Sequence, residues 1–252
     1  MGPLLVFVRT VAVCIAYLGF ALVGVTLWGG KFISENRRHT LIAWFTHLWA
    51  RCSCFLFNIR IRVVGGFQVV PGSLIVANHI GTPDIFVLGA CFPGFFVSKA
   101  EIAEWPLFNW LARLGDTIFA DRDKRHQVKE IIEQMRGRLE ERCSVILFPE
   151  GRATSGRELL DFKPSTFEAA VRAGCDVVPT TIIYHDGHQP SIACWYEVTF
   201  FQHILRLLKN PCLEVTVFVH EPIQGETDRC VLAEKSWRIV RETHAKETRS
   251  GD

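Results

Sequence analysis

Length, composition and charge limit what this chain can be. It has 252 residues, 49% of them hydrophobic and 21% charged, so one sizeable core is expected and a disordered protein is excluded. The formal net charge is +2 and no long Lys/Arg tract is present, so no nucleic-acid partner is expected. The nine cysteines are scattered without a CxxC pair, which is typical of core residues in a reducing compartment.

The N-terminal region is apolar enough to enter a membrane. Thr10 to Trp28 carries no formal charge over nineteen residues, a length that can span a bilayer. A cleaved signal peptide and a buried core helix are the alternatives. Lys31, Arg37 and Arg38 follow the run, so a spanning helix would leave the rest of the chain in the cytoplasm. We therefore expect a membrane protein whose folded part lies on the cytoplasmic face.

A second helix is predicted directly after this run. Its apolar residues recur on one helical stripe, which suits either the membrane interface or packing against the folded part. The members of this stripe are Leu41, Trp44, Phe45, Leu48, Trp49, Cys52, Phe55 and Leu56. We expect residues 1–57 to form N-terminal membrane-anchoring helices in contact with lipids, and residues 58–252 to form one globular domain.

From residue 59 onward, predicted strands alternate with predicted helices. Short runs rich in β-branched and aromatic residues predict strands, and apolar residues at helical spacing predict helices. The predicted strands are 59–64, 74–77, 95–98, 117–120, 145–148, 177–183, 196–200 and 213–219. The predicted helices follow Pro83, Trp105 and Pro164, cover 128–139, and run from Asp228 to His244. This order predicts an α/β fold with a mixed, largely parallel sheet flanked by helices, whose ligands meet the carboxyl ends of the strands.

The clearest candidate chemistry follows the predicted strand at 74–77. Thr82 is a good N-cap and Pro83 suits the first helical position, so Asp84 is expected in the first turn of a helix and His79 just before it. The intervening turn can bring the imidazole to the carboxylate. Such a carboxylate fixes the imidazole tautomer and stabilises the imidazolium, which makes the other ring nitrogen a general base. A helix-capping Asp beside a hydrogen-bonded His is the alternative interpretation.

A nucleophilic side chain to accompany this pair is missing from the sequence. No GxSxG motif is present, so an acceptor substrate's own hydroxyl is expected to replace the serine of a hydrolase triad. The reaction would be direct attack on a thioester carbonyl, without an acyl-enzyme. The other histidines lack metal-ligand spacing, and His185 and His188 fit a polar turn, so no metal is expected.

Four blocks of residues, in this order, resemble the glycerolipid acyltransferases, typified by 1-acyl-glycerol-3-phosphate acyltransferase. The blocks are Asn78-His79-x4-Asp84, Gly115-Asp-Thr-Ile-Phe119-Ala-Asp-Arg122, Phe148-Pro149-Glu150-Gly151 and Val178-Pro179. The similarity covers about Ile59 to Val219. It implies a glycerol-3-phosphate acyltransferase-like fold for residues 58–252, a His general base with an Asp partner, and basic residues near the second and third blocks that bind the acceptor's phosphate.

The resemblance also assigns substrate-binding roles to particular residues. Arg122 corresponds to the second block's arginine and Lys99 to a lysine often found upstream of it, both just after predicted strands where they can meet a phosphate. Glu150 and Gly151 end the next strand and are expected to hold acceptor hydroxyls or orient the basic residues. Arg152 is expected to supply a basic group from a shifted position. Surface charges and a plain strand-end turn are the alternatives.

The chain departs from the family pattern at two places. The third block usually continues with Thr and then Arg or a small polar residue, where this chain has Arg152-Ala153-Thr154-Ser155. The family also often has a glycine within the stretch that reads Lys163-Pro164-Ser165-Thr166-Phe167 here. These departures leave the shape of the acceptor pocket open.

The sequence therefore predicts an acyltransferase. It would move a fatty acyl chain from acyl-CoA or acyl-ACP, as co-substrate and with no other cofactor, to the free hydroxyl of a lysophospholipid acceptor. The first expectation is 1-acyl-glycerol-3-phosphate, giving phosphatidate, and the alternative acceptor is another lyso-lipid such as a lyso-aminolipid. A lipid hydrolase or thioesterase, and a non-catalytic membrane module, are the alternatives of other classes.

Overall fold

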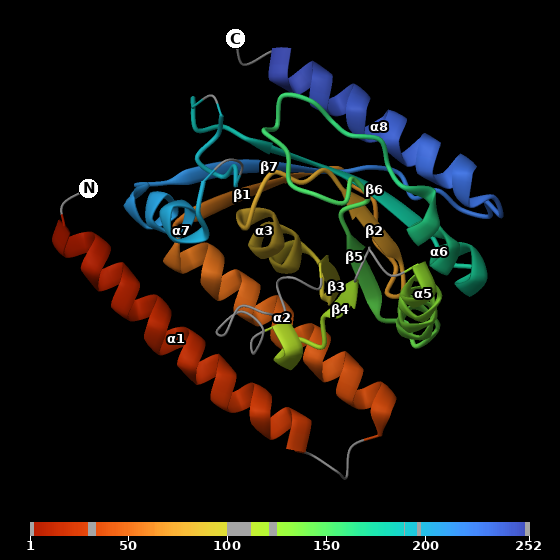
Figure 1. Ribbon diagram of the computed structural model, residues 1–252, viewed down its shortest axis with the longest axis horizontal. Helices are drawn as coiled ribbons and strands as arrows, with labels where there is room; N and C mark the ends of the chain where they lie inside the picture. The colour runs from red at the N-terminus through yellow and green to blue at the C-terminus, as the bar shows by residue number, and fades with distance from the viewer. Residues whose placement is uncertain are drawn as a thin grey trace.

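Two long helices open the chain and lie on one side of the molecule (Figure 1). They are α1 (Pro3–Gly29) and α2 (Glu35–Leu56), and they pack against each other. The computed structural model describes residues 3–29, 34–99, 112–120, 125–188, 190–195 and 198–249. In that part of the chain one helical stretch, Pro3–Leu27, is long and apolar enough to cross a membrane.

Helix α1 contacts the rest of the molecule near both of its ends. Close to its start, Nη1 of Arg9 donates a 2.7 Å hydrogen bond to the main-chain oxygen of Asn210, at the end of α7 (Phe200–Lys209). Close to its end, Gly24 makes room for Leu114, whose side chain would lie 3.2 Å from a Cβ added at that glycine. Helix α1 therefore lies along the domain instead of projecting from it.

The remainder of the chain forms a seven-stranded sheet with the order β1-β7-β6-β2-β5-β3-β4. The strands are β1 (Ile59–Val64), β2 (Leu74–Ala77), β3 (Gly94–Lys99), β4 (Ile118–Ala120), β5 (Ser144–Leu147), β6 (Val177–Tyr184) and β7 (Leu213–Val219). Neighbouring strands are parallel except β6 and β7, which pair antiparallel. This confirms the predicted mixed, largely parallel sheet.

Helices cover both faces of this sheet. They are α3 (Pro83–Cys91), α5 (Arg125–Glu140), the 3-10 turn η2 (Pro164–Phe167), α6 (Glu168–Ala173), α7 and α8 (Arg229–Arg249). One buried cluster joins residues of α2, α3 and α7 to the sheet, and another joins α5, α6 and α8 to it. Successive residues of β2 alternate between the two clusters, Ile75 in the first and Val76 in the second, which explains why a central strand is apolar throughout.

One predicted strand is wrong. In the described part of the 196–200 segment, Thr199 caps α7 instead of extending a strand: its hydroxyl accepts the Gln202 N–H, and the Gln202 side chain accepts the Thr199 N–H. This reciprocal pair is a capping box, and it starts a helix whose inner face buries Leu207 and Leu208. Of the helix predicted after Trp105, residues 105–111 lie outside the described part of the chain, and residues 112–114 are helical.

Candidate active site

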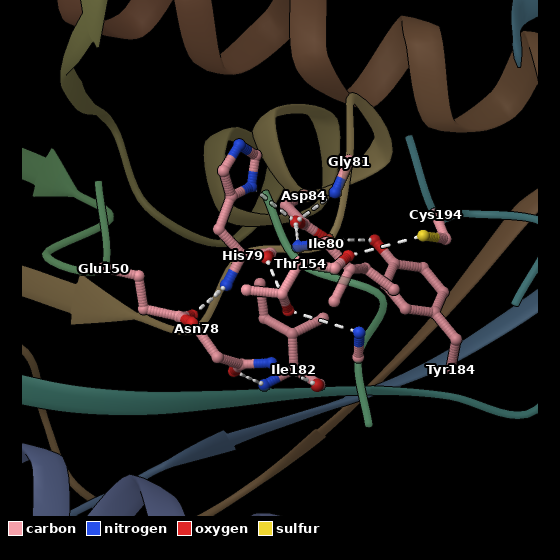
Figure 2. A network of polar contacts seen from close by, with 11 residues as sticks. Asn78, His79, Ile80, Gly81, Asp84, Glu150, Thr154, Ile182, Tyr184 and Cys194 are labelled. Carbon is pink, nitrogen blue, oxygen red and sulfur yellow. Dashed lines mark hydrogen bonds and ion pairs between the residues drawn. The ribbon is translucent and has the colours of Figure 1, made fainter. Parts of the chain in front are cut away.

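The candidate catalytic pair lies at the carboxyl end of β2, where the chain turns into α3. Nδ1 of His79 is 2.7 Å from Oδ2 of Asp84, and the imidazole is 19% exposed while the carboxylate is 1% exposed. Pro83 occupies the first turn of α3, but Thr82 makes no side-chain cap, contrary to the prediction. The Asp84 carboxylate replaces that cap by binding the amides that precede the helix (Figure 2).

The carboxylate of Asp84 is saturated with donors. Its Oδ2 atom accepts the N–H groups of Ile80 at 2.7 Å and Gly81 at 3.0 Å in addition to the imidazole. Its Oδ1 atom accepts the hydroxyl of Tyr184 at 2.7 Å. Because an ionised carboxylate only accepts hydrogen bonds, His79 donates its Nδ1 proton here and leaves Nε2 without one. The ring nitrogen that does not contact Asp84, Nε2, is therefore able to accept a proton.

Glu150, expected to contact the acceptor, binds the protein's own backbone. Its Oε1 atom accepts the His79 N–H at 2.8 Å and its Oε2 atom accepts the Leu160 N–H at 2.9 Å. The side chain is buried, and this burial raises the pKa of Glu150 to about 7. Gly151 follows it with φ 84, a backbone conformation that favours glycine. Glu150 thus joins the backbone at His79 to the backbone at Leu160.

Of the three basic residues that were predicted to bind substrate, only Arg152 has a side chain in the described part of the chain. Lys99 ends β3, beside Ala120 of β4, and its side chain lies outside the described part of the chain. Arg122 lies outside the described residues. Arg152 is exposed on the loop after Gly151. Phosphate binding by these residues stays a prediction.

Neighbouring loops fix the backbone around His79. Its carbonyl accepts the Thr154 N–H at 3.0 Å, and its ring stacks on Phe148 with the centroids 4.1 Å apart. Asn78 exchanges two hydrogen bonds with Ile182 of β6, at 3.0 and 2.8 Å. The third block and β6 therefore hold the two sides of the His79 loop, as Figure 2 shows.

Gly81 is required for a close backbone approach that sequence reasoning missed. A Cβ added there would lie 2.0 Å from the carbonyl oxygen of Ala193. The adjacent Trp195 N–H donates to Ile80 O at 2.8 Å. Residues 191–195 thus cover the His79 loop, and the sequence contained no recognisable signal for this because the segment is irregular.

Two cavities lie beside the pair, one on each face of the sheet. The first has a volume of about 110 Å³ and lies between α1, α2 and α3. It is lined by Ile85, the residue that follows Asp84 in the sequence. Its lining is almost entirely apolar and includes Phe20, Phe45, Trp49, Phe96 and Leu114. The second has about 200 Å³ and is lined by Phe148, Pro149 and residues of β3, β5 and α5, with Lys163, Ser165 and Thr166 at η2. In the described ranges no three His, Cys, Asp or Glu side chains are grouped to hold a metal ion.

Comparison with known proteins places the chain in a family. A model of the family described as Acyltransferase matches residues 60–183. A lyso-ornithine lipid O-acyltransferase from Pseudomonas aeruginosa is 34% identical over 206 residues, covering 78% of this chain and 76% of that protein. A 1-acyl-sn-glycerol-3-phosphate acyltransferase from Neisseria gonorrhoeae is 35% identical over 115 residues, covering 46% of this chain and 45% of that protein.

A solved structure supports the fold assignment. The crystal structure of the 1-acyl-sn-glycerophosphate (LPA) acyltransferase PlsC from Thermotoga maritima superposes with a TM-score of 0.64 at 19% identity, covering 95% of this chain and 98% of that one. At this identity the similarity shows the shared fold. The match to the family model and the alignment with the Pseudomonas aeruginosa relative, over 76% of that protein, establish the family. This chain belongs to the acyltransferase family and is an acyltransferase.

Proposed function

We propose that this enzyme transfers a fatty acyl chain from a thioester, acyl-CoA or acyl-ACP, to the free hydroxyl of a lysolipid, with His79 as general base. The observation that carries this proposal is the 2.7 Å contact between Nδ1 of His79 and the buried carboxylate of Asp84, which leaves Nε2 of the partly exposed ring to accept a proton. The two relatives differ in acceptor, but the names of both describe lipid acyl transfer.

The reaction follows from this geometry. Nε2 of His79 takes the proton of the acceptor hydroxyl as its oxygen attacks the thioester carbonyl, and Asp84 stabilises the imidazolium that forms. The carbon–sulfur bond then breaks, and the proton on Nε2 passes to the departing thiolate. The products are an ester and a free thiol, and His79 returns to its neutral form without an acyl-enzyme.

The acceptor that similarity favours is a lyso-ornithine lipid. The relative named for that acceptor is 34% identical over 78% of this chain, whereas relatives named as 1-acyl-sn-glycerol-3-phosphate acyltransferases that align over a similar share, 72 to 80%, are 24 to 28% identical. The two departures from the family pattern, at Arg152-Ala153-Thr154-Ser155 and within 163–167, leave room for an acceptor other than lysophosphatidate. Lysophosphatidate is the second candidate, because the chain keeps the four ordered blocks of that family.

We also propose how the chain meets the membrane. Residues 1–57 act as the anchor of the acyltransferase domain formed by 58–252, with the domain on the cytoplasmic face. Large apolar side chains are exposed along α1, α2 and the start of α7: Leu4, Phe7, Ile15, Leu18, Leu22, Trp44, Leu48, Phe55 and Phe201. A spanning α1 would draw Asn210 and Leu114, which contact its two ends, toward the hydrocarbon. We therefore place α1 in the plane of one leaflet, where the apolar cavity behind it can receive an acyl chain.

A panel of donors and acceptors tests the proposal. Purified protein in lipid vesicles is given labelled acyl-CoA or acyl-ACP together with lyso-ornithine lipid, lysophosphatidate or no acceptor, and the products are identified by mass spectrometry. The proposal predicts an acylated lipid only when a lysolipid is present. Release of free fatty acid at the same rate without any acceptor would identify a thioesterase, and absence of turnover with every pair would leave a non-catalytic module.

A further inference from the structure

Tyr184 reaches the candidate catalytic pair from a distant part of the sequence. Strand β6 runs parallel to β2 with Ala77 opposite Thr180, and it continues to Tyr184 after β2 has ended. The end of β6 therefore lies beneath the loop that carries His79. From this position the Tyr184 hydroxyl donates a 2.7 Å hydrogen bond to Oδ1 of Asp84 (Figure 2).

The two oxygens of Asp84 are held unequally. Oδ2 accepts three hydrogen bonds, from the imidazole and from two backbone amides. Among the described residues, Tyr184 is the one donor to Oδ1. The three donors to Oδ2 already restrain the carboxylate, and the Tyr184 hydroxyl adds a fourth contact, on the other oxygen, that resists rotation about the Cβ–Cγ bond. That rotation decides whether Oδ2 stays directed at Nδ1 of His79.

The phenol is suited to this role because it stays neutral. Burial, and then the charge of Asp84, raise the pKa of Tyr184 well above its usual range, so the hydroxyl keeps its proton and remains a donor. A neutral donor stabilises the carboxylate without supplying a positive charge that would compete with the imidazolium.

Other titratable groups near this pair carry little charge at neutral pH. His203 of α7 faces the Asp84 carboxylate, and burial lowers the pKa of His203 to about 4, so it is neutral. Cys54 of α2 faces Tyr184, and burial raises the pKa of that thiol to about 12. Glu150 is the exception, because its pKa of about 7 leaves it partly ionised behind the His79 backbone. Asp186, in the turn that follows β6, also raises the pKa of Tyr184 through its negative charge.

We propose that Tyr184 is a positioning residue of the His79–Asp84 pair, holding the carboxylate so that it keeps the imidazole in the orientation that proton transfer requires. This inference rests on the proposed general-base role of His79. It assigns a function to a side chain outside the four blocks of family resemblance, and it links the loop that carries His79 to the end of β6, the strand whose Ile182 also binds Asn78.

Replacing Tyr184 by Phe tests this role, because the ring packing is kept and only the hydroxyl is lost. Loss of a hydrogen bond to a charged group predicts a fall in kcat of about ten- to hundredfold, with the KM values for donor and acceptor changed by less than about twofold. The unshared charge on Asp84 holds the imidazolium more strongly. The acidic limb of the kcat profile should therefore move to higher pH in Y184F.

A matched control is available in Tyr17, a buried tyrosine of α1. Its hydroxyl lies 2.9 Å from Oγ of Ser53, far along the chain from the catalytic loop. Tyr17→Phe should leave kcat and its pH profile within about twofold of the wild type, since it removes a hydrogen bond between α1 and α2 only. If Y184F matches Y17F in both kcat and pH profile, the positioning role is wrong. That result would not affect the proposed acyl transfer or the proposed role of His79 as general base.

A second variant keeps the test decisive if Y184F does not fold. A 3-fluorotyrosine at position 184 retains the ring and the hydroxyl and is a stronger donor. It should keep kcat within about threefold of the wild type and move the acidic limb to lower pH, opposite to the shift in Y184F. An unchanged profile, or a shift to higher pH, would overturn the proposal. If the wild-type protein transfers no acyl chain to any lysolipid, the proposed function itself is rejected, whatever the variants show.

Discussion

The carboxylate of Glu150 accepts the backbone N–H of His79 at 2.8 Å, although 71 residues separate them in the sequence. The other oxygen of the same carboxylate accepts the N–H of Leu160 at 2.9 Å. One buried acid therefore fastens the loop after β2 to the loop after β5. The orientation of the candidate base depends on a side chain that need not touch substrate.

Replacing Glu150 by Gln tests this dependence. The amide keeps one acceptor oxygen but turns an NH₂ group toward the second backbone N–H, so one of the two loop contacts is lost. We expect kcat to fall about tenfold, which corresponds to one hydrogen bond to a charged group. Steady-state kinetics in vesicles measures the change. Glu158→Gln, at an exposed position on the same loop, is the control and should match the wild type.

The pKa of Glu150 also predicts a dependence of stability on pH. Burial raises the pKa from 4.5 to about 7, so the folded state holds this proton more tightly than the unfolded state. The stabilisation from protonated Glu150 is complete below about pH 4.5 and is lost as the pH rises through about 7. The free energy of unfolding of the wild type, minus that of Glu150→Gln, should fall over this window in denaturant titrations. A constant difference would show that Glu150 does not titrate there.

The apolar cavity predicts control over acyl-chain length. Phe45 of α2 lines this cavity and packs edge-on against Phe20 of α1, with ring centroids 5.3 Å apart. Phe45→Ala enlarges the cavity, so the ratio of kcat/KM for longer over shorter acyl thioesters should rise by about four- to fifteenfold, the value of burying one to two more methylene groups. Phe67→Ala, on the exposed loop after β1, serves as the control. An identical chain-length profile in the two variants would place the acyl chain elsewhere.

The contacts of α1 predict its orientation in the membrane. Arg9 binds the end of α7, and Gly24 packs on Leu114, so both ends of the helix stay with the domain. Short epitope tags at the two termini should therefore be cleaved by protease from the same, cytoplasmic, side of sealed vesicles. Protection of the N-terminal tag together with cleavage of the C-terminal tag would show that α1 spans the bilayer.

Much of the fold was predictable because its strands and helices have strong local patterns. Leu74–Ala77 and Leu213–Val219 are strands with the predicted bounds, since continuous β-branched and apolar runs have few other conformations. Helix α7 was missed because its start depends on the capping box of Thr199 and Gln202, and the aromatic residues beside it suggested a strand.

The site was predictable only where its parts are close in sequence. His79 and Asp84 lie within one turn, so local geometry was enough to bring them together. The contacts of Glu150 and Tyr184 depend on which strands are neighbours, and the order β6-β2-β5 cannot be read from local pattern. Tyr184 carried only a weak signal, a polar aromatic residue at the end of a largely apolar strand.

The general-base role of His79 is tested most directly by acyl transfer from a labelled thioester to a lysolipid, comparing the wild type with His79→Ala. His188→Ala, which alters an exposed histidine on a surface turn, is the matched control. The proposed mechanism predicts that His79→Ala lowers kcat by about a thousandfold or more while His188→Ala retains full activity. A folded His79→Ala variant that transfers the acyl chain at the wild-type rate would contradict it.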